Sequence, residues 1–194
     1  MQHILQFLHI AEKLKMEMRH SWLSNGRQES VAEHTWRLTL MAMTLEPYFT
    51  QPLNMEKLLK MLIIHDLAEV VIGDIPAFEV STRKEEKHAA EDKAMRELCA
   101  TLGEHGDNLY TLWEEGEAKQ TYEAKVANAI DKLEAQLQHN EAAIETWLPI
   151  EHEMTFKLRK HTAFDETMDA LREVIVEEGI AKLQLANIDT TRWE

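Results

Sequence analysis

The sequence predicts an all-α fold, and three of its features favour that class. Gly and Pro number only 6 and 4 in 194 residues, whereas strand-rich folds need frequent turn residues. Met, Leu, Ala, Glu and Lys are plentiful, and these residue types form helices readily. Apolar residues also recur at the spacing of one helical face over several long segments. We therefore expect a helical bundle, with residues 1–194 forming a single domain around a sizeable core.

Apolar spacing and capping residues place the expected helices along the chain. A Ser, Thr, Asn or Asp before an apolar stripe marks a helix start, most strongly when Glu follows three residues later. Gly or Pro after a stripe marks an end. The expected helices are 2–17, 30–46 with a capping box from Ser30 to Glu33, 54–73 after Asn54, 82–102 with a capping box from Thr82 to Glu85, 107–117, 121–144 after Thr121, and 165–186.

The segments between these helices carry turn and breaker residues. Residues 19–29 are expected to be a loop with its turn at Asn25-Gly26. Pro47 and Pro149 should end the helices that precede them. We find no internal repeat, low-complexity run or flexible linker, which is why one domain is the economical interpretation.

Composition excludes several classes of partner. The formal net charge is -14, and such a surface repels nucleic acid unless a large basic patch is present. A small phosphate ester is still compatible, because a bound cation can reverse the local field. The lone Cys99 cannot form an intrachain disulfide, which fits a reducing compartment. The apolar stretches are too short to span a bilayer, and the first residues do not resemble a signal peptide. We expect a cytoplasmic protein with no membrane or nucleic-acid partner.

A pair of adjacent polar residues, His65-Asp66, interrupts a helix that otherwise has a buried pattern. Acidic groups in such a helix are costly unless something compensates their charge, and a bound cation would do so. Glu69 follows three and four residues later and shares the same helical face. Asp74 comes at the predicted end of that helix. These carboxylates would repel each other and raise one another's pKa values without a metal.

Two other predicted helices offer further metal ligands. His34 lies near the start of the helix capped by Ser30, and Asp131 interrupts an apolar stripe in the long helix after Thr121. With His65 and Asp66 they supply two imidazoles and two carboxylates. Such mixed ligands suit one divalent cation, such as Mn, Co, Fe, Ni or Zn. Positions left to water or substrate are typical of a catalytic site.

These residues resemble the motif of the HD-domain metal-dependent phosphohydrolases. The similarity is greatest to the branch that contains the bacterial 5'-deoxynucleotidase and its eukaryotic relatives. It extends over about residues 13–137, and the helices over about 150–194 are expected to be a C-terminal extension. The matching segments are Glu29 to His34, His65 to Pro76 with Glu69, Gly73 and Asp74, the run from Lys84 to His88, and distant Asp131.

The resemblance implies a role for each of these residues and a function for the protein. His34, His65, Asp66 and Asp131 would hold one divalent cation, with Mg as a further possible identity. Glu69 and Asp74 would act on the attacking water or the leaving oxygen. Arg19 would bind the phosphate and Trp22 would line the sugar pocket. The expected protein is therefore a 5'-nucleotidase, a homodimer in this family, that removes phosphate from (deoxy)nucleoside monophosphates by attack of a metal-activated water.

The sequence departs from the bacterial pattern in the loop before His34. Arg19 and Trp22 are not adjacent, and the loop is slightly shorter, so His20 could occupy the sugar-lining position instead. Two other functions are alternatives to the nucleotidase. A two-metal phosphodiesterase or oxygenase needs extra histidines before Asp131, where only His88 and His105 are available. A non-catalytic nucleotide-binding regulator would usually have lost a ligand.

Most other polar residues have an ordinary structural interpretation. The charged run from Lys84 to Glu91 is expected to be a solvated helix face. The remaining histidines are expected at the surface: His3, His9, His105, His139, His152 and His161.

Overall fold

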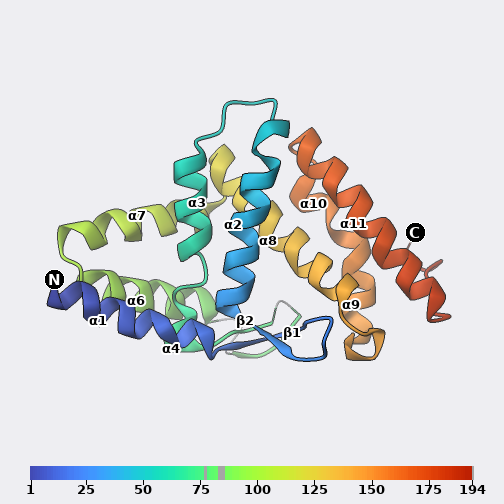
Figure 1. Cartoon of the computed structure of the whole chain (residues 1–194), viewed down its shortest axis with the longest axis horizontal. Coiled ribbons are helices and arrows are strands. Elements are labelled where there is room, and N and C mark those ends of the chain that lie inside the picture. The colour runs from blue at the N-terminus through green and yellow to red at the C-terminus, as the bar shows by residue number, and fades with distance from the viewer. Residues whose placement is uncertain (77, 83–85, 194) are drawn as a thin grey trace.

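The computed structural model describes residues 1–76, 78–82 and 86–193, and it confirms the all-α prediction (Figure 1). The first half contains α1 (Gln2–Ala11), α2 (Val31–Leu45), α3 (Met55–Ile64) and α4 (Glu69–Ile72). The second half contains α6 (Lys87–Ala100), α7 (Glu104–Ala118), α8 (Tyr122–Glu141), α9 (Pro149–Met154), α10 (Arg159–Thr162) and α11 (Glu166–Leu185). Short 3-10 turns lie at Glu12–Lys15, Glu46–Tyr48, Ile144–Thr146 and Thr155–Lys157. No described helix combines the length and the apolar character needed to cross a membrane.

Side-chain caps begin the main helices where the sequence predicts them. At α2 the Ser30 hydroxyl accepts the Glu33 N–H at 3.3 Å, and the Glu33 carboxylate accepts the Ser30 N–H at 2.9 Å. Asn54 caps α3 and Thr121 caps α8 in the same way. These bonds satisfy backbone donors that a helix start leaves free. The predicted capping box at 82–85 includes residues 83–85, which lie outside the described part of the chain.

The predicted loop at 19–29 is wrong in part, because it forms an antiparallel hairpin of β1 (Met18–Trp22) and β2 (Gln28–Ser30). The turn is where it was expected: Gly26 has a φ of +84°, a conformation that glycine adopts without steric cost. The strands are short and mostly polar, so they lack the β-branched alternation that predicts strands.

The predicted helix at 54–73 is also wrong in one respect, because it breaks at His65–Ala68. α3 ends at Ile64, and the backbone then tightens: the Leu67 N–H donates to the Ile64 carbonyl at 3.1 Å. The Glu69 N–H donates to the Asp66 carbonyl at 3.0 Å. Such i to i−3 bonds are typical of helix ends and functional bends. His65 and Asp66 therefore lie on a turn rather than on a continuous helix.

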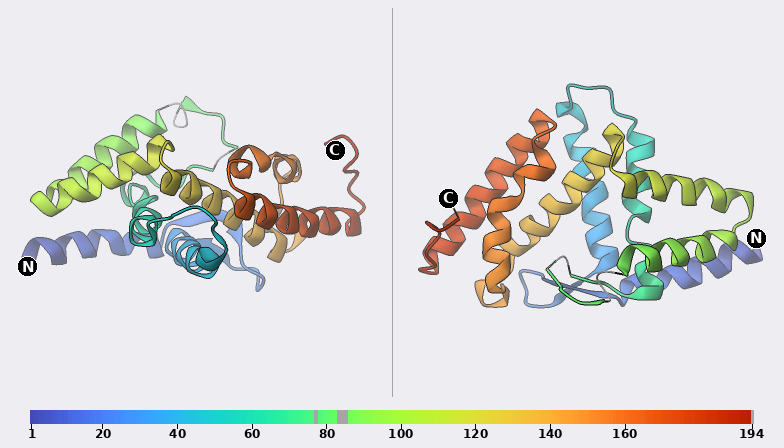
Figure 2. Two further views of the ribbon diagram at one scale, coloured as in Figure 1. Left: turned by 90° about the horizontal axis from the view of Figure 1, so that it is seen from above. Right: turned by 180° about the vertical axis from the view of Figure 1, so that it is seen from behind.

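The long helix α8 organises the core. Seen from above, α1, α2 and α3 form a front layer with α6, α7 and α8 behind them (Figure 2). α8 packs against α2, α3, α7 and α11. The apolar residues at these contacts include Leu38, Leu62, Ile130 and Met168, each fully buried. Since apolar burial contributes about 25 cal/mol per Å², this packing holds α2, α3 and α8 in fixed relative positions.

Charged residues gather at one end of this core. Glu29, His34 and Glu134 are each no more than 1% exposed. Glu29 belongs to β2, His34 to α2 and Glu134 to α8, and the hairpin contacts both of these helices (Figure 1). Buried charges on this scale are tolerated only when they are paired or bind an ion.

Close packing of α6 on α7 gives a direct test of the fold. A Cβ built at Gly106 would lie 1.8 Å from the Cys99 carbonyl oxygen. We expect Gly106→Ala to lower the free energy of unfolding by roughly 2–4 kcal/mol. Chemical denaturation followed by circular dichroism measures this loss.

Gly116 in the same helix is the matched control, because a Cβ there would meet nothing within 4 Å. We expect Gly116→Ala to be neutral or to stabilise by up to about 1 kcal/mol, because Ala has the higher helix propensity. Equal stability of the two variants would contradict the described packing of α6 against α7.

Candidate metal centre

The four predicted ligands come together from three segments of the chain. His34 lies in the first turn of α2, His65 and Asp66 on the turn after α3, and Asp131 in the middle of α8. His65 Nε2 is 3.0 Å from Asp66 Oδ2. His34 Nε2 is 3.2 Å from Asp131 Oδ1 and 4.0 Å from Asp66 Oδ2. One donor atom each from His34, His65 and Asp66 lie within 4.8 Å of one another.

Each histidine is oriented by a hydrogen bond from its other ring nitrogen. His34 Nδ1 bonds the buried carboxylate of Glu134. His65 Nδ1 lies 2.7 Å from the Leu62 carbonyl oxygen, which can only accept. Both partners are acceptors, so each Nδ1 carries a proton and each Nε2 faces the two aspartates, where it offers a lone pair once the ring is neutral. Metal-binding histidines are held in this way in proteins generally.

The donor set fits a divalent cation. His65 Nε2 is buried and, within the described ranges, has no hydrogen-bond partner, although Asp66 Oδ2 is only 3.0 Å away. A lone pair and a carboxylate oxygen at that distance repel each other unless a proton or a cation lies between them. A cation would satisfy both atoms together with His34 and Asp131.

The charges around the cluster shift its pKa values strongly. Burial acts to lower the pKa of His65, but the carboxylates of Asp66 and Asp131 raise it to about 9. Burial acts to raise the pKa of Asp66, but His65 holds it well below its usual range. The pKa of Asp131 is also low: burial acts to raise it, but Lys132, His34 and His65 together outweigh that effect. The site therefore concentrates negative charge that needs a positive partner.

Glu69 and Asp74 lie beside this cluster. Glu69 is only 3% exposed, and burial, then the charges of Asp66 and Asp74, raise its pKa to about 9. Burial also raises the pKa of Asp74, and the Asp74 backbone N–H donates to the Glu17 carboxylate at 2.8 Å. Both side chains line the cavity that reaches the cluster.

Three cations face the acidic cluster. Arg19 lies 3.6 Å from Asp66 Oδ2 and 3.3 Å from the buried Glu29 carboxylate. Lys132 Nζ is 2.8 Å from Asp131 Oδ2, and Lys87 Nζ is 3.7 Å from Glu69 Oε1. These groups make the cavity locally favourable for a phosphate despite the acidic surface.

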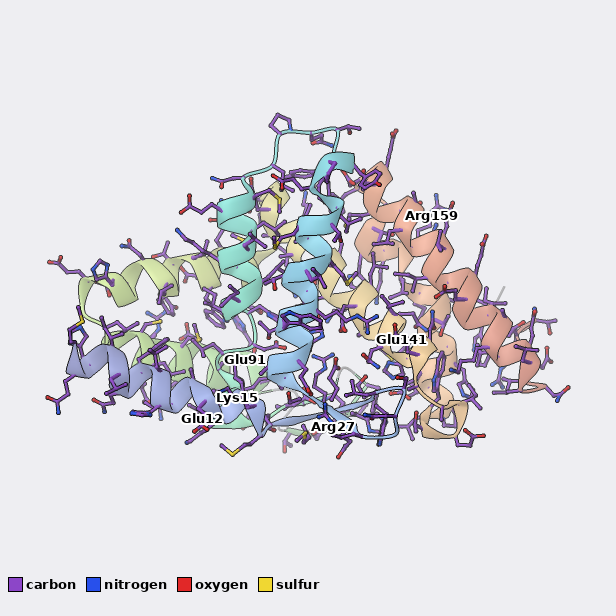
Figure 3. All side chains as sticks on the ribbon, in the orientation of Figure 1. Glu12, Lys15, Arg27, Glu91, Glu141 and Arg159 are labelled. Carbon is purple, nitrogen blue, oxygen red and sulfur yellow. The ribbon has the colours of Figure 1, made fainter. Side chains whose placement is uncertain are left out.

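The expectation of a solvated face over 84–91 is wrong at its inward side. Lys87 is only 23% exposed and Glu91, its ion-pair partner at 3.2 Å, is 14% exposed. Both point toward the turn after α3, and Figure 3 shows Glu91 near the base of that helix. Residues 84 and 85 lie outside the described part of the chain.

A cavity of about 190 Å³ leads away from the cluster. Arg19, Asp66 and Asp131 lie at its inner end, and His20, His139 and Glu151 also line it. Trp22 is not one of its lining residues. Instead the Trp22 ring packs edge-on against His20, with centroids 4.8 Å apart. A second hollow, of about 260 Å³, opens on the other side of Asp66 and Asp131, beside Trp113.

Comparison with known proteins places the chain in a family. A family model described as "HD domain" matches residues 11–172. The chain belongs to the HD-domain family. This membership confirms the resemblance seen in the motifs around His34, His65 and Asp66.

Relatives of this HD domain include enzymes named 5'-deoxynucleotidase HDDC2. The Homo sapiens protein is 37% identical over 71% of this chain and 67% of its own length. The Dictyostelium discoideum protein is 33% identical over 86% of this chain and 89% of its own length. A solved structure of a predicted metal-dependent phosphohydrolase from Magnetospirillum magnetotacticum is also similar, with a TM-score of 0.77, 25% identity and 93% of each chain covered.

Several residues around this HD-domain site were not predicted from the sequence. Glu134 is one helical turn after Asp131 on α8, a spacing that could have revealed it. The sequence does not single out Lys132, because a lysine on a long helix is usually an ordinary surface residue. His139 was expected at the surface, but it lines the cavity and is 3.0 Å from Glu151 Oε1. Glu151 follows no recognisable motif, so only the folded chain reveals it.

The raised pKa of His65 predicts how metal binding depends on pH. A histidine binds metal in its neutral form, and in the metal-free protein His65 is protonated below about pH 9. Binding at pH 7 should therefore release a proton. We expect the affinity for Mn²⁺ to rise by about tenfold per pH unit from pH 6 to 8, as measured by isothermal titration calorimetry.

The same titration in buffers of different ionisation enthalpy is the internal control. The dependence of the binding enthalpy on the buffer gives the number of protons released, independently of the affinity. A histidine with its ordinary pKa of about 6.5 would give an affinity that levels off above pH 7. That result would contradict the described environment of His65.

Proposed function

We propose that the chain is a metal-dependent phosphohydrolase that removes phosphate from deoxynucleoside 5'-monophosphates. One observation carries the proposal: the Nε2 atoms of His34 and His65 lie against the carboxylates of Asp66 and Asp131, and these two carboxylates line a cavity. The names of the HDDC2 relatives support the substrate class. His34, His65, Asp66 and Asp131 would hold one cation per chain, from the group Mn, Co, Fe, Ni, Zn and Mg.

The bound cation would lower the pKa of a water and polarise a phosphoryl oxygen. The protein's own part begins with holding the phosphate. The Arg19 guanidinium can fork onto two phosphate oxygens, and Glu29 holds that side chain from behind at 3.3 Å. Lys87 and Lys132 add positive charge from two other helices. Charge that develops on the phosphoryl oxygens is thereby stabilised in a largely buried site.

Glu69 is suited to move the proton of the reaction. Its pKa of about 9 means that it carries a proton at pH 7 in the metal-free protein. Its Oε2 atom is buried and has no hydrogen-bond partner among the residues described. We assign Glu69 Oε2 as the atom that gives a proton to the leaving 5'-oxygen. Asp74, which lines the same cavity, orients the attacking water.

We assign the sugar-lining role to His20 rather than to Trp22. His20 lines the cavity directly, and its Nε2 atom is 3.4 Å from Glu151 Oε1. Trp22 supports the His20 ring edge-on from behind. Trp22 is itself held in place because the Gln138 side-chain amide donates to its carbonyl oxygen at 2.8 Å.

One observation favours a second candidate, the two-metal phosphodiesterase. Donor atoms of His88, Glu91 and Glu117 lie within 4.8 Å of one another, and the two glutamates line the second hollow beside Asp66. A metal content of two ions per chain would favour that function. A content of one supports the nucleotidase.

Phosphate release from a panel of ribo- and deoxyribonucleoside 5'-monophosphates tests the proposal. We expect turnover of the deoxy substrates with Mn²⁺ or Co²⁺, and a loss of at least about 10³-fold in Asp66→Ala. Circular dichroism should show that the helical content survives in the variant. Zn²⁺ and Mg²⁺ complete the comparison.

Asp107→Ala is the matched control, because this aspartate is exposed in the first turn of α7. It should keep wild-type activity. Equal activity of Asp66→Ala and the wild type would rule out the assigned site, and a wild type inert toward every nucleotide would rule out the function.

We also propose that the protein is a homodimer that uses the outer face of α2. Trp36, Leu40 and Met43 are 64%, 42% and 57% exposed, and their spacing places them on one helical face. Exposed apolar stripes of this kind are typical of interaction surfaces. A second copy of the chain is the partner expected from the family.

Light scattering coupled to size-exclusion chromatography tests this assembly. The wild type should have the mass of two chains, and Leu40→Glu should have the mass of one, because a charge would be buried in the interface. Leu185→Glu is the control, since Leu185 is 85% exposed on the distant helix α11. A monomeric wild type would contradict the dimer.

We also propose that the chain forms a single domain and that the protein is cytoplasmic. A single domain is supported by Leu112 and Met41, each of which packs against two of the three hydrophobic clusters and so connects them. A cytoplasmic location is supported by Cys99, which is buried as a free thiol, as expected in a reducing compartment.

A further inference from the structure

The outer part of the cavity has a polar wall built around Glu151. This residue lies in α9 and is 5% exposed. Its Oε1 atom is 3.0 Å from His139 Nε2 and 3.4 Å from His20 Nε2. The three side chains come from α9, α8 and β1, and all of them line the cavity. Nothing in the phosphate-transfer mechanism uses this wall.

Glu151 is held as an ionised acceptor. Its Oε2 accepts the Leu148 N–H at 2.6 Å, which fixes the carboxylate at the start of α9. His139 Nδ1 lies 2.6 Å from the Ala135 carbonyl oxygen, so the His139 ring is fixed between that carbonyl and Glu151. Burial acts to raise the pKa of Glu151, but the hydrogen bond from His139 lowers it below the usual value.

The carboxylate still has room for one more donor. Each carboxylate oxygen can accept about two hydrogen bonds. Oε2 is committed to the backbone and Oε1 to His139. His20 Nε2, at 3.4 Å, makes no hydrogen bond of acceptable geometry with the described residues. A substrate hydroxyl entering the cavity would therefore meet an open acceptor position on Oε1.

The position of the wall along the cavity matches the sugar of a nucleotide. Arg19 and His20 are consecutive in β1, and both line the cavity. Arg19 lies 3.6 Å from Asp66 at the phosphate end, and His20 lies against Glu151. The phosphate contact and the polar wall are therefore adjacent along the chain. In a nucleoside 5'-monophosphate the sugar is the group next to the phosphate.

Apolar side chains complete the outer cavity around this wall. Ile75, Pro76 and Phe78 line it after α4, and Met154 and Leu158 line it after the start of α9. The Phe78 ring packs edge-on against His20, with centroids 5.2 Å apart. Such surfaces suit the flat faces of a base, whereas the ionised Glu151 suits a hydroxyl donor.

We propose that Glu151, held by His139, accepts a hydrogen bond from the 3'-hydroxyl of the substrate sugar and so determines specificity for it. This inference rests on the proposed nucleotidase function. Acidic side chains that accept from ribose hydroxyls are a recurring device in nucleotide sites. A site with a buried acceptor for a hydroxyl rejects the analogue that lacks it, because the acceptor is then left without a partner.

Two substrates that differ only in this hydroxyl test the proposal. We would measure kcat/KM for 2'-deoxyadenosine and 2',3'-dideoxyadenosine 5'-monophosphates with the Mn²⁺-loaded full chain. The wild type should prefer the deoxy substrate by roughly 10- to 100-fold. In Glu151→Gln the amide oxygen can keep the Leu148 bond, but an NH₂ group replaces Oε1, so the preference should fall to within about threefold.

Glu153→Gln is the matched control. Glu153 is in the same helix and forms an exposed ion pair with Lys157, so this variant should keep the wild-type preference. A partly misfolded Glu151→Gln would lower kcat/KM for both substrates equally, and the ratio of the two would still report on the hydroxyl.

Each outcome bears on a specific claim. A wild type that hydrolyses both substrates with equal kcat/KM overturns the inference while leaving the nucleotidase function in place. So does a Glu151→Gln variant with the wild-type ratio. A wild type that releases phosphate from neither substrate overturns the proposed function and this inference together.

Discussion

The site depends on the close contact of two histidines, His34 and His65, with two aspartates, Asp66 and Asp131. Each histidine ring is held in position by a hydrogen bond at Nδ1. Glu134 and the Leu62 carbonyl oxygen each accept a hydrogen bond from the Nδ1–H of a histidine, so the Nε2 atoms of His34 and His65 face Asp66 and can bind a cation once they are deprotonated. Without a cation the carboxylates raise the pKa of His65 to about 9. When a cation is bound, the same carboxylates would act as its ligands. The buried charge that would destabilise an empty core is thus the property that makes a metal centre.

The fold supplies three fixed points for this meeting. The capping box at Ser30 starts α2 four residues before His34. The break after Ile64 turns His65 and Asp66 toward the end of the core, and the hairpin brings Arg19 against both Asp66 and Glu29. α8 contributes Asp131, the fourth proposed ligand, and Glu134, which accepts a hydrogen bond from His34. Because α2, α3 and α8 pack tightly on one another, His34 and Asp131 are held by rigid helices, and His65 and Asp66 lie on the tight turn that directly follows α3.

The sequence predicts the helices and the ligands but misses the residues that support them. Helix starts at Ser30, Asn54 and Thr121 depend on local chemistry, so they can be recognised from a few neighbouring residues. Asp66 and Asp131 are recognisable because an acid in an apolar stripe is a conflict that needs an explanation. The break at His65 and the hairpin depend on tertiary packing, which overrides local propensity.

Lys87 and Glu151 are ordinary residues on polar helix faces, and only the fold reveals that they point inward, whereas the spacing of Glu134 from Asp131 could have revealed it from the sequence. Their positions also resolve an apparent contradiction between a chain of charge -14 and an anionic substrate. Arg19, Lys87 and Lys132 place positive charge in the cavity beside its five carboxylates, and a bound cation would add to that positive charge. The most direct test of the central claim is anomalous X-ray diffraction from crystals grown with Mn²⁺. The account predicts one anomalous peak per chain, bonded to His34, His65, Asp66 and Asp131 together. A peak elsewhere, or none at this site, would contradict it.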